Sequence, residues 1–230
     1  MKLLAFETAT EACSVALWID GMVIERFEIA PRRHAELSLP WAEQLMAEAG
    51  IARSQLDGIA VGRGPGAFTG VRLAIALAQG IAMALDKPVV AVSTLAALAM
   101  QSAGDCTLAA IDARMGEIYI GAFERIGDAQ LATSAETVVR PDAVLVPDGG
   151  SWTGVGTGFA AADGALVDRL SDRLSTIDAA ALPHAADVAR LAAAAFLRGE
   201  AVAADRIEPA YLRNDVALTL VQQAAHRAAR

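Results

Sequence analysis

Basic residues are scarce in this sequence, and they never form a run. The chain carries 19 Lys and Arg residues against 27 Asp and Glu residues, which gives a formal net charge of -8 and a pI of about 4.9. A domain that grips phosphates by itself usually presents a basic patch. We therefore expect any role on a nucleic acid to pass through a partner.

Reactive and metal-binding side chains are also few. Cys13 and Cys106 are far apart and form no CxxC pattern, so we expect two buried apolar side chains, with a disulfide or redox pair as the alternative. The histidines His34, His184 and His226 are widely spaced and include no His-x-x-x-His pair. A metal site needs several ligands close together. We therefore expect no metal site, and we interpret His34 as a capping or surface residue.

Long apolar runs are lacking as well. Leu73–Met100 is a candidate membrane segment, but Asp86, Lys87 and Pro88 divide it into two parts that are each too short to span a bilayer. Glu7 interrupts the apolar beginning of the chain, which does not fit a signal peptide. We therefore expect a cytoplasmic protein with no membrane contact.

Hydrophobic residues make up 55% of the chain, and their spacing predicts alternating strands and helices. Asp20-Gly21 between two apolar runs indicates a hairpin, and Leu37, Trp41 and Leu45 recur every four residues, as in an amphipathic helix. The predicted elements are strands Lys2–Glu7, Ser14–Ile19 and Met22–Ile29, helix Ala35–Ala49, strand Leu56–Val61, a helix capped by Thr69 and ending at Leu85, strand Pro88–Val92 and helix Thr94–Gln101. This order, βββαβαβα, is that of the ribonuclease-H-like fold, a mixed sheet flanked by helices.

A weak internal repeat predicts a second subdomain of the same kind. Leu108–Asp112 echoes Leu3–Glu7, because each is a short apolar strand that ends in a carboxylate and precedes a turn and another strand. We expect an N-terminal subdomain over residues 1–104 and a C-terminal subdomain over residues 105–230. Within the second, we predict a glycine-rich loop at Gly149–Gly158, a helix at His184–Leu197 and a last helix over residues 214–230 that packs back on the first subdomain.

Four segments, in the same order, resemble those of one protein family. They are LAFETATEACSVAL at residues 4–17, GRGPGAFTGVR at residues 62–72, VSTL at residues 92–95 and PAYLR at residues 209–213. Together they resemble the TsaB (YeaZ) family over nearly the whole chain. One departure is Glu7, where the family usually has Asp.

The resemblance implies an α/β fold of the actin-like, sugar-kinase ATPase type with two related mixed-sheet subdomains. It also implies a non-catalytic scaffold that dimerises with its catalytic paralogue TsaD, is joined by TsaE, and pairs with itself when alone. That complex places threonylcarbamoyl, supplied by TsaC as an adenylate, on the adenosine next to the tRNA anticodon. We expect tRNA contact only through the complex, no tightly bound cofactor, and ATP, ADP or magnesium only at the level of the complex. The alternatives are a stand-alone ATPase of the actin-like superfamily and an M22-type peptidase homologue.

Candidate nucleotide contacts are Glu7, Asp112, Gly156 and Gly158. Carboxylates that face each other across a cleft hold magnesium or do acid–base work, whereas the alternative is a pair of solvated residues at strand ends. The glycine-rich loop Gly62–Gly66 precedes a helix but lacks the Gly-Lys-Ser/Thr ending of a P-loop. We therefore interpret it as a tight strand-to-helix turn, with phosphate binding as the alternative.

The helix Gly70–Leu85 is too poor in charge for an ordinary surface helix. Either two layers bury it or its outer face meets a partner, and the resemblance favours the partner. The predicted interface residues on this helix and the preceding one are Leu37, Trp41, Leu45, Arg72, Ala76, Gln79, Gly80 and Met83.

Overall fold

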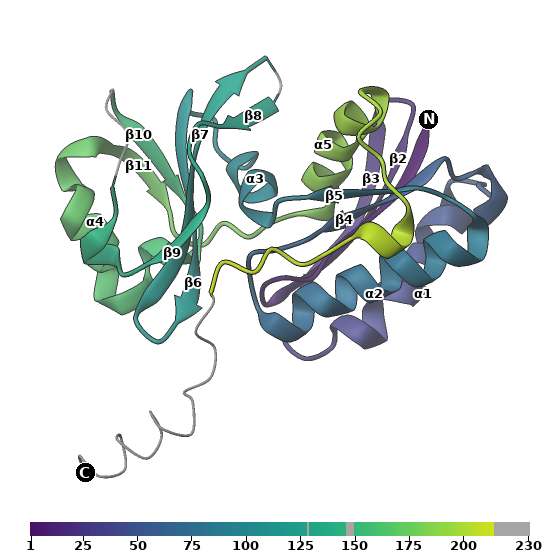
Figure 1. Ribbon diagram of the computed structural model, residues 1–230, viewed down its shortest axis with the longest axis horizontal. Coiled ribbons are helices and arrows are strands. Elements are labelled where there is room, and N and C mark those ends of the chain that lie inside the picture. The colour runs from purple at the N-terminus through teal and green to yellow at the C-terminus, as the bar shows by residue number, and fades with distance from the viewer. Residues whose placement is uncertain (128, 146–149, 214–230) are drawn as a thin grey trace, which may run out of the picture.

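The computed structural model describes residues 1–127, 129–145 and 150–213, which form two β-sheets side by side (Figure 1). The first sheet has the order β3-β2-β1-β4-β5, in which β1 pairs antiparallel with β2 and parallel with β4. Its strands are β1 (Lys2–Glu7), β2 (Ala12–Ile19), β3 (Met22–Ile29), β4 (Gly58–Gly62) and β5 (Val89–Val92).

The second sheet repeats this topology. Its order is β11-β10-β6-β7-β8, with β9 also paired to β7, and β6 is antiparallel to β7 and parallel to β10. The central strand β6 thus corresponds to β1, which confirms the predicted pair of related mixed-sheet subdomains. The strands are β6 (Cys106–Arg114), β7 (Glu117–Ile126), β8 (Ala129–Ala132), β9 (Thr137–Val139), β10 (Trp152–Val155) and β11 (Leu174–Asp178).

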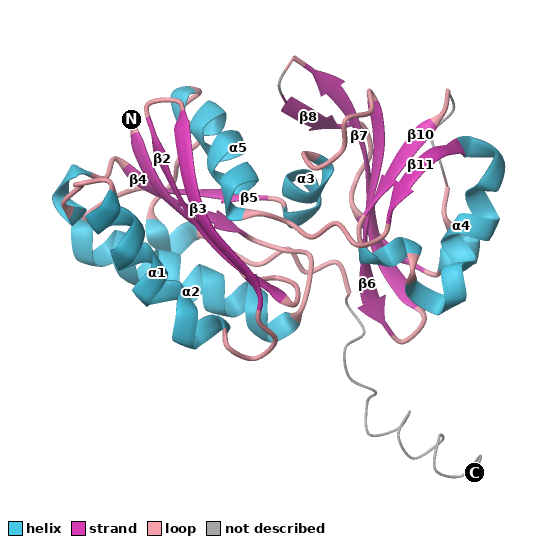
Figure 2. Ribbon diagram, turned by 180° about the vertical axis from the view of Figure 1, so that it is seen from behind, coloured by secondary structure: helices cyan, strands magenta, loops and turns pink. Residues whose placement is uncertain are grey.

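Helices cover both faces of the first sheet. Figure 2 shows α1 and α2 on one side of it and α5 on the other, with α3 between the two sheets and α4 beside the second. The helices are α1 (His34–Glu48), α2 (Phe68–Leu85), α3 (Thr94–Ala99), α4 (Ala165–Leu170) and α5 (Ala185–Leu197). Short 3-10 helices are η1 (Arg53–Gln55), η2 (Pro141–Ala143), η3 (Thr157–Phe159), η4 (Ala161–Gly164), η5 (Ser171–Arg173) and η6 (Ala204–Arg206).

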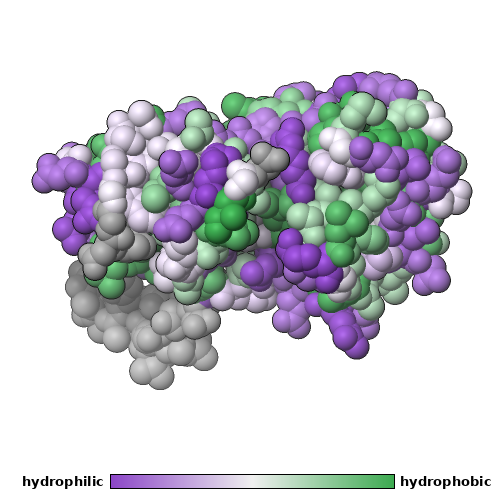
Figure 3. All heavy atoms as spheres, turned by 90° about the horizontal axis from the view of Figure 1, so that it is seen from above, coloured by the Kyte–Doolittle hydropathy of each residue, from purple (hydrophilic) through white to green (hydrophobic). Residues whose placement is uncertain are grey.

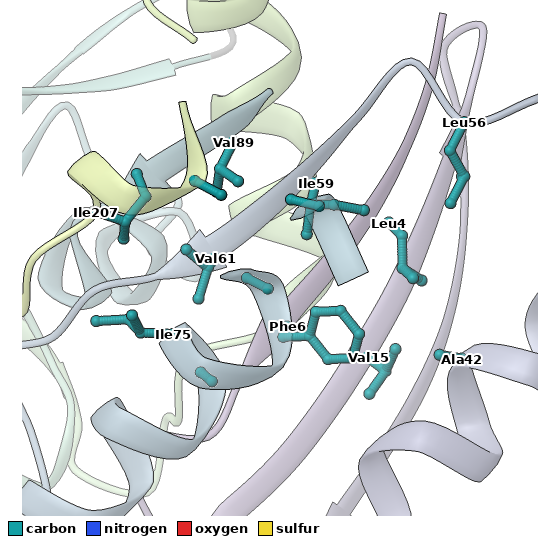
Figure 4. Close-up of a cluster of buried hydrophobic side chains, with 14 of the residues drawn as sticks. Leu4, Phe6, Val15, Ala42, Leu56, Ile59, Val61, Ile75, Val89 and Ile207 are labelled. Atoms are coloured by element: carbon teal, nitrogen blue, oxygen red, sulfur yellow. The ribbon is translucent and has the colours of Figure 1, made fainter. Parts of the chain in front are cut away.

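Alternation along the strands builds a separate core on each face of the first sheet. Leu4 and Phe6 of β1 point toward α1 and α2, and they pack with Val15, Ile59 and Ile75 (Figure 4). The alternate residues of β1, such as Leu3 and Ala5, point to the other face of the sheet and pack against the alanine-rich face of α5. The close α5 packing follows from alanine, since a methyl side chain lets a helix approach a sheet closely.

Because of this packing, the chain returns to the first sheet at Ala185, within the range 105–230 that we expected to form the second subdomain. The correction has a physical reason: the face of β1, β2 and β4 opposite α1 and α2 is apolar and needs a cover, which α5 supplies. Val202 also pairs with the edge of the sheet at Val89. The last helix predicted over residues 214–230 lies outside the described residues.

Two further predictions differ from the structure. Helix α2 begins at Phe68 with Ala67 at its N-cap and no side-chain cap, so Thr69 lies inside the helix. The expected loop Gly149–Gly158 contains strand β10, in which Gly154 leaves room for the ring of Phe159. Gly154 is thus required by packing against Phe159 and not by a turn.

Helix α2 is long and apolar enough, by length and composition, to cross a membrane. Its inner face, however, is part of the first core, where Val71, Ala74, Ile75, Ala78 and Ala82 are buried. A core helix of a soluble protein passes the same test, so this feature does not by itself indicate a membrane protein.

Candidate functional site

The outer face of α2 is apolar and open to solvent. Ala76, Gly80 and Ala84 are exposed on it, and Met83 is 71% exposed. Beside it, Leu39 of α1 is 45% exposed and lines a shallow cavity of about 290 Å³ between α1 and α2. The cavity walls are largely apolar, so this pair of helices presents a hydrophobic surface with a hollow in it. On the face shown in Figure 3, hydrophobic and hydrophilic side chains are interspersed.

The predicted stripe on α1 lies mostly inside the molecule. Leu45 is fully buried in the first core, and Trp41 is half-buried against it; Leu37 is half-buried as well. Leu45 is therefore a core residue, because the stripe that recurs every four residues is the one that faces the sheet. Leu39, a large apolar residue of α1 that lies outside this stripe, is exposed.

The two polar residues of the predicted interface face a segment of the chain itself. We call residues 202–213 the strap; it runs from the edge of the first sheet over α2 toward the second subdomain (Figure 1). Gln79 donates hydrogen bonds to the carbonyl oxygens of Ala204 and Ile207 in the strap, at 2.9 and 3.3 Å. Arg72 donates to the Tyr211 hydroxyl. Ala76, Gly80 and Met83 thus remain on the open face, while Arg72 and Gln79 fasten the strap.

Glu7 is enclosed at the end of β1. One carboxylate oxygen accepts the Ala9 N–H at 2.7 Å, and the other accepts the Thr94 hydroxyl at 2.9 Å. Burial raises the pKa of Glu7 from its ordinary value of 4.5 to about 7, and these hydrogen bonds partly oppose the rise. The carboxylate also rests against Gly62, where an added Cβ would lie 1.9 Å from Oε2. Glu7 therefore supports the loop after β4, and each of its carboxylate oxygens accepts a hydrogen bond from within the first subdomain.

Asp112 occupies a different environment. It lies at the end of β6, is 26% exposed, and forms an ion pair with Arg114 at 2.9 Å. Asp112 lines a cavity between the subdomains, and Glu7 is not among the lining residues. The two carboxylates that the repeat suggested as a facing pair are thus not brought to one site, because Glu7 turns inward beneath β4.

Gly156 and Gly158 are explained by close packing. An added Cβ at Gly156 would lie 2.3 Å from the carbonyl oxygen of Ala110, and one at Gly158 would lie 2.6 Å from the Ala110 Cβ. Gly156 also has a φ of 105°, which favours glycine. Both glycines hold η3 against β6. Gly70 likewise lets α2 pack closely against the segment after β1, since an added Cβ there would lie 2.0 Å from the Thr8 carbonyl oxygen.

The cavity between the subdomains has a volume of about 750 Å³. Its lining combines the N-terminal end of α2, the end of β6, the turn before α1 and the strap. His34 lies at its wall, where Nε2 is 3.0 Å from the Thr10 carbonyl oxygen and 3.2 Å from that of Ala12. Within residues 1–127, 129–145 and 150–213, no three His, Cys, Asp or Glu side chains are grouped so as to hold a metal ion.

Two sheets of one topology, facing each other across this cavity, define the actin-like fold. Consistent with that class, the model of the family described as TsaD, tRNA N6-adenosine threonylcarbamoyltransferase, matches residues 27–220. The protein YeaZ from Pseudomonas aeruginosa has a similar structure, with a TM-score of 0.86 and 46% sequence identity over 92% of this chain and 99% of that one.

Curated relatives define the family more narrowly. The tRNA threonylcarbamoyladenosine biosynthesis protein TsaB of Escherichia coli (strain K12) is 40% identical, over 94% of this chain and 96% of that protein. The TsaB protein of Haemophilus influenzae is 35% identical, over 94% and 95%. The chain belongs to the TsaB (YeaZ) family.

Proposed function

We propose that this chain acts in the biosynthesis of threonylcarbamoyladenosine in tRNA as a non-catalytic subunit that dimerises with a TsaD protein. In this proposal TsaE joins the assembly, tRNA is contacted only through the complex, and the chain works in the cytoplasm and pairs with itself when alone. The observation that carries the proposal is the open apolar face of α2 with Leu39 beside it. Contiguous apolar surface of this kind marks protein–protein interaction sites.

The residues on this face suit a helix–helix contact. Ala76 and Gly80 lack bulk, and an added Cβ at Gly80 would meet nothing within 4 Å. A partner helix can therefore come close to α2, while the exposed Met83 side chain supplies flexible apolar contact area. A protein of the same fold offers an equivalent helix pair, which supports pairing with TsaD and self-pairing in its absence.

The geometry at Glu7 supports a subunit without chemistry of its own. In the actin-like fold, the carboxylate at the end of the first strand approaches the metal of the nucleotide. Here both Glu7 oxygens accept internal hydrogen bonds, and the side chain is 1% exposed. We propose that the isolated chain holds no nucleotide tightly, and that ATP, ADP or magnesium matters only in the complex.

The experiment is the substitution Ala76→Glu. In the free chain it replaces one exposed helical residue by another, which costs only a few tenths of a kcal/mol. In a dimer through α2 it buries an unpaired carboxylate, at a cost of about 3–5 kcal/mol, so affinity for TsaD should fall at least a hundredfold. Light scattering of the mixture with purified TsaD measures the dimer, and threonylcarbamoylation of tRNA measures function.

Ala194→Glu is the matched control. Ala194 is also an exposed helical alanine, but it lies on α5 across the sheet from α2. Its variant should bind TsaD as the wild type does. If Ala76→Glu protein binds TsaD with wild-type affinity, the α2 face is not the interface and the proposal is wrong.

A further inference from the structure

The strap is fastened firmly to the first subdomain. The N–H groups of Val202 and Val89 each donate to the other residue's carbonyl oxygen, at 2.9 and 2.8 Å. Ile207 is 6% exposed in the first core, and the Gln79 hydrogen bonds hold the carbonyl groups of Ala204 in η6 and of Ile207 directly after it. This part of the strap behaves as an added edge and cover of the first sheet.

Beyond η6 the strap crosses the rim of the large cavity. The Ala210 N–H donates to the carbonyl oxygen of Arg63 at 2.8 Å. The guanidinium of Arg72 lies 3.2 Å from the centroid of the Phe68 ring and 5.0 Å from that of Tyr211. A cation between two aromatic faces is attracted to both, so Arg72 fixes Tyr211 at the N-terminal end of α2.

The strap reaches the second subdomain through Arg213. Its guanidinium forms an ion pair with Glu117 at the start of β7, and it donates to the carbonyl oxygen of Ala113 at 3.2 Å. The Arg213 side chain is 19% exposed and that of Glu117 is 35% exposed. Charge-assisted hydrogen bonds that are partly shielded from water are stronger than ordinary surface ion pairs.

A second connection between the subdomains is α3. Leu95 and Leu98 pack into the core of the second subdomain with Ile111 and Phe123, whereas Ala97 packs with α5. Figures 1 and 2 both show α3 between the sheets, away from the end of the strap near the end of β6. The two subdomains are therefore joined by a packed helix at one place and by the strap, which lines the cavity, at another.

We infer that the strap is a latch on the cleft between the subdomains, with α3 as the hinge and the Arg213–Glu117 contact as the point of release. The first subdomain holds the strap through main-chain pairing, a buried side chain and Gln79. Among the residues that the structure describes, the hydrogen bonds and the ion pair between the strap and the second subdomain all come from the Arg213 side chain. When the Arg213 contacts break, the strap stays on the first subdomain and the cleft opens. This inference concerns the chain alone and does not depend on the proposed partner.

Hydrogen exchange on the full chain tests where the strap releases. Arg213→Gln removes the positive charge of the ion pair, and Glu117→Gln removes the negative charge. Two different variants therefore break the same contact. In both, exchange of the Ala210 amide should stay near the wild-type rate, because its acceptor, the carbonyl oxygen of Arg63, belongs to the first subdomain. Exchange of the Val202 amide, which bonds to Val89 of β5, should stay at the wild-type rate as well.

A distance measurement tests whether the cleft opens. Spin labels are placed on the exposed residues Glu36 and Asp168 through cysteine substitutions, in a chain whose own Cys13 and Cys106 are replaced by alanine. The distribution of distances should be narrow in the parent chain and both longer and broader with Arg213→Gln or Glu117→Gln. Arg198→Gln, which breaks an exposed ion pair with Glu200, is the control and should change neither readout.

Two outcomes would overturn the latch. In one, the variants keep the parental distance distribution, which means that the Arg213 contact holds nothing closed. In the other, the Val202 and Ala210 amides exchange faster than in the parent chain, which means that the strap leaves the first subdomain. Thermal unfolding of each variant checks that it is folded, and Arg213→Lys, which retains a charged donor, should lie between wild type and Arg213→Gln.

Discussion

Replacing Glu7 by glutamine removes a titratable group that is completely buried. In the native state the pKa of Glu7 is raised to about 7, chiefly by burial, whereas its ordinary value is 4.5. Between these two pH values the native protein keeps a proton that the unfolded chain has released. Raising the pH through this window therefore lowers the free energy of unfolding, and the loss is complete above about pH 7.

The size of this loss follows from the difference between the two pKa values. One pKa unit corresponds to about 1.4 kcal/mol, so Glu7 should cost the protein about 3 kcal/mol between pH 4.5 and pH 8. Glutamine has nearly the same shape, can still accept the Ala9 N–H, and has no proton to lose. Between pH 4.5 and pH 8, the free energy of unfolding of the variant should therefore rise by about 3 kcal/mol relative to that of the wild type. This change does not depend on how far the two proteins differ at pH 4.5.

Urea unfolding of both proteins at pH 4.5, 6, 7 and 8 measures this change. The informative quantity is the difference between their free energies of unfolding at each pH, because other titrating groups contribute equally to both proteins and cancel. A difference that stays constant with pH would refute the reasoning, since it would mean that the Glu7 carboxyl group is as well solvated in the native state as in the unfolded chain.

Other substitutions test the packing around α2. Gly70→Ala should destabilise the protein by about 1–3 kcal/mol, because its Cβ would press on the Thr8 carbonyl group; Gly80→Ala, in the same helix with open space around it, should stabilise it by up to about 1 kcal/mol. Thermal melts that move in the same direction for both would contradict this assignment. Gln79→Ala should cost about 1–3 kcal/mol in urea unfolding, since it leaves two strap carbonyl groups without their donor. A wild-type unfolding midpoint would show that water replaces this donor at no cost.

Local patterns were sufficient to predict much of the first sheet. The strand at Lys2–Glu7 and the hairpin partner at Met22–Ile29 have the predicted bounds, because alternation and the Asp-Gly turn act within a few residues. The helix predicted at Ala35–Ala49 is α1, shifted by one residue. The repeat of an apolar strand that ends in a carboxylate also indicated the second sheet.

What sequence patterns missed depends on contacts between distant residues. The role of Gln79 is set by carbonyl groups some 125 residues later in the chain, so a polar residue on an apolar helix looked like part of a partner surface. A stripe of apolar residues such as the one that contains Leu45 is expected both on a helix that faces the core and on a helix that faces a partner. The spacing of the residues does not distinguish these two cases. Glu7 gave no sign that it turns inward, because its surroundings come from Gly62 and Thr94 on other elements.

The return of α5 to the first sheet reverses the order in which the two halves are finished during synthesis. A ribosome delivers the chain from its N-terminus, and domains generally fold in that order. Here Leu3, Ala5 and Ala16 on one face of the first sheet have no cover until α5, at Ala185–Leu197, has left the ribosome. Every strand of the second sheet, from β6 to β11, has been made by then. The half of the protein that is translated first is thus the half that is completed last.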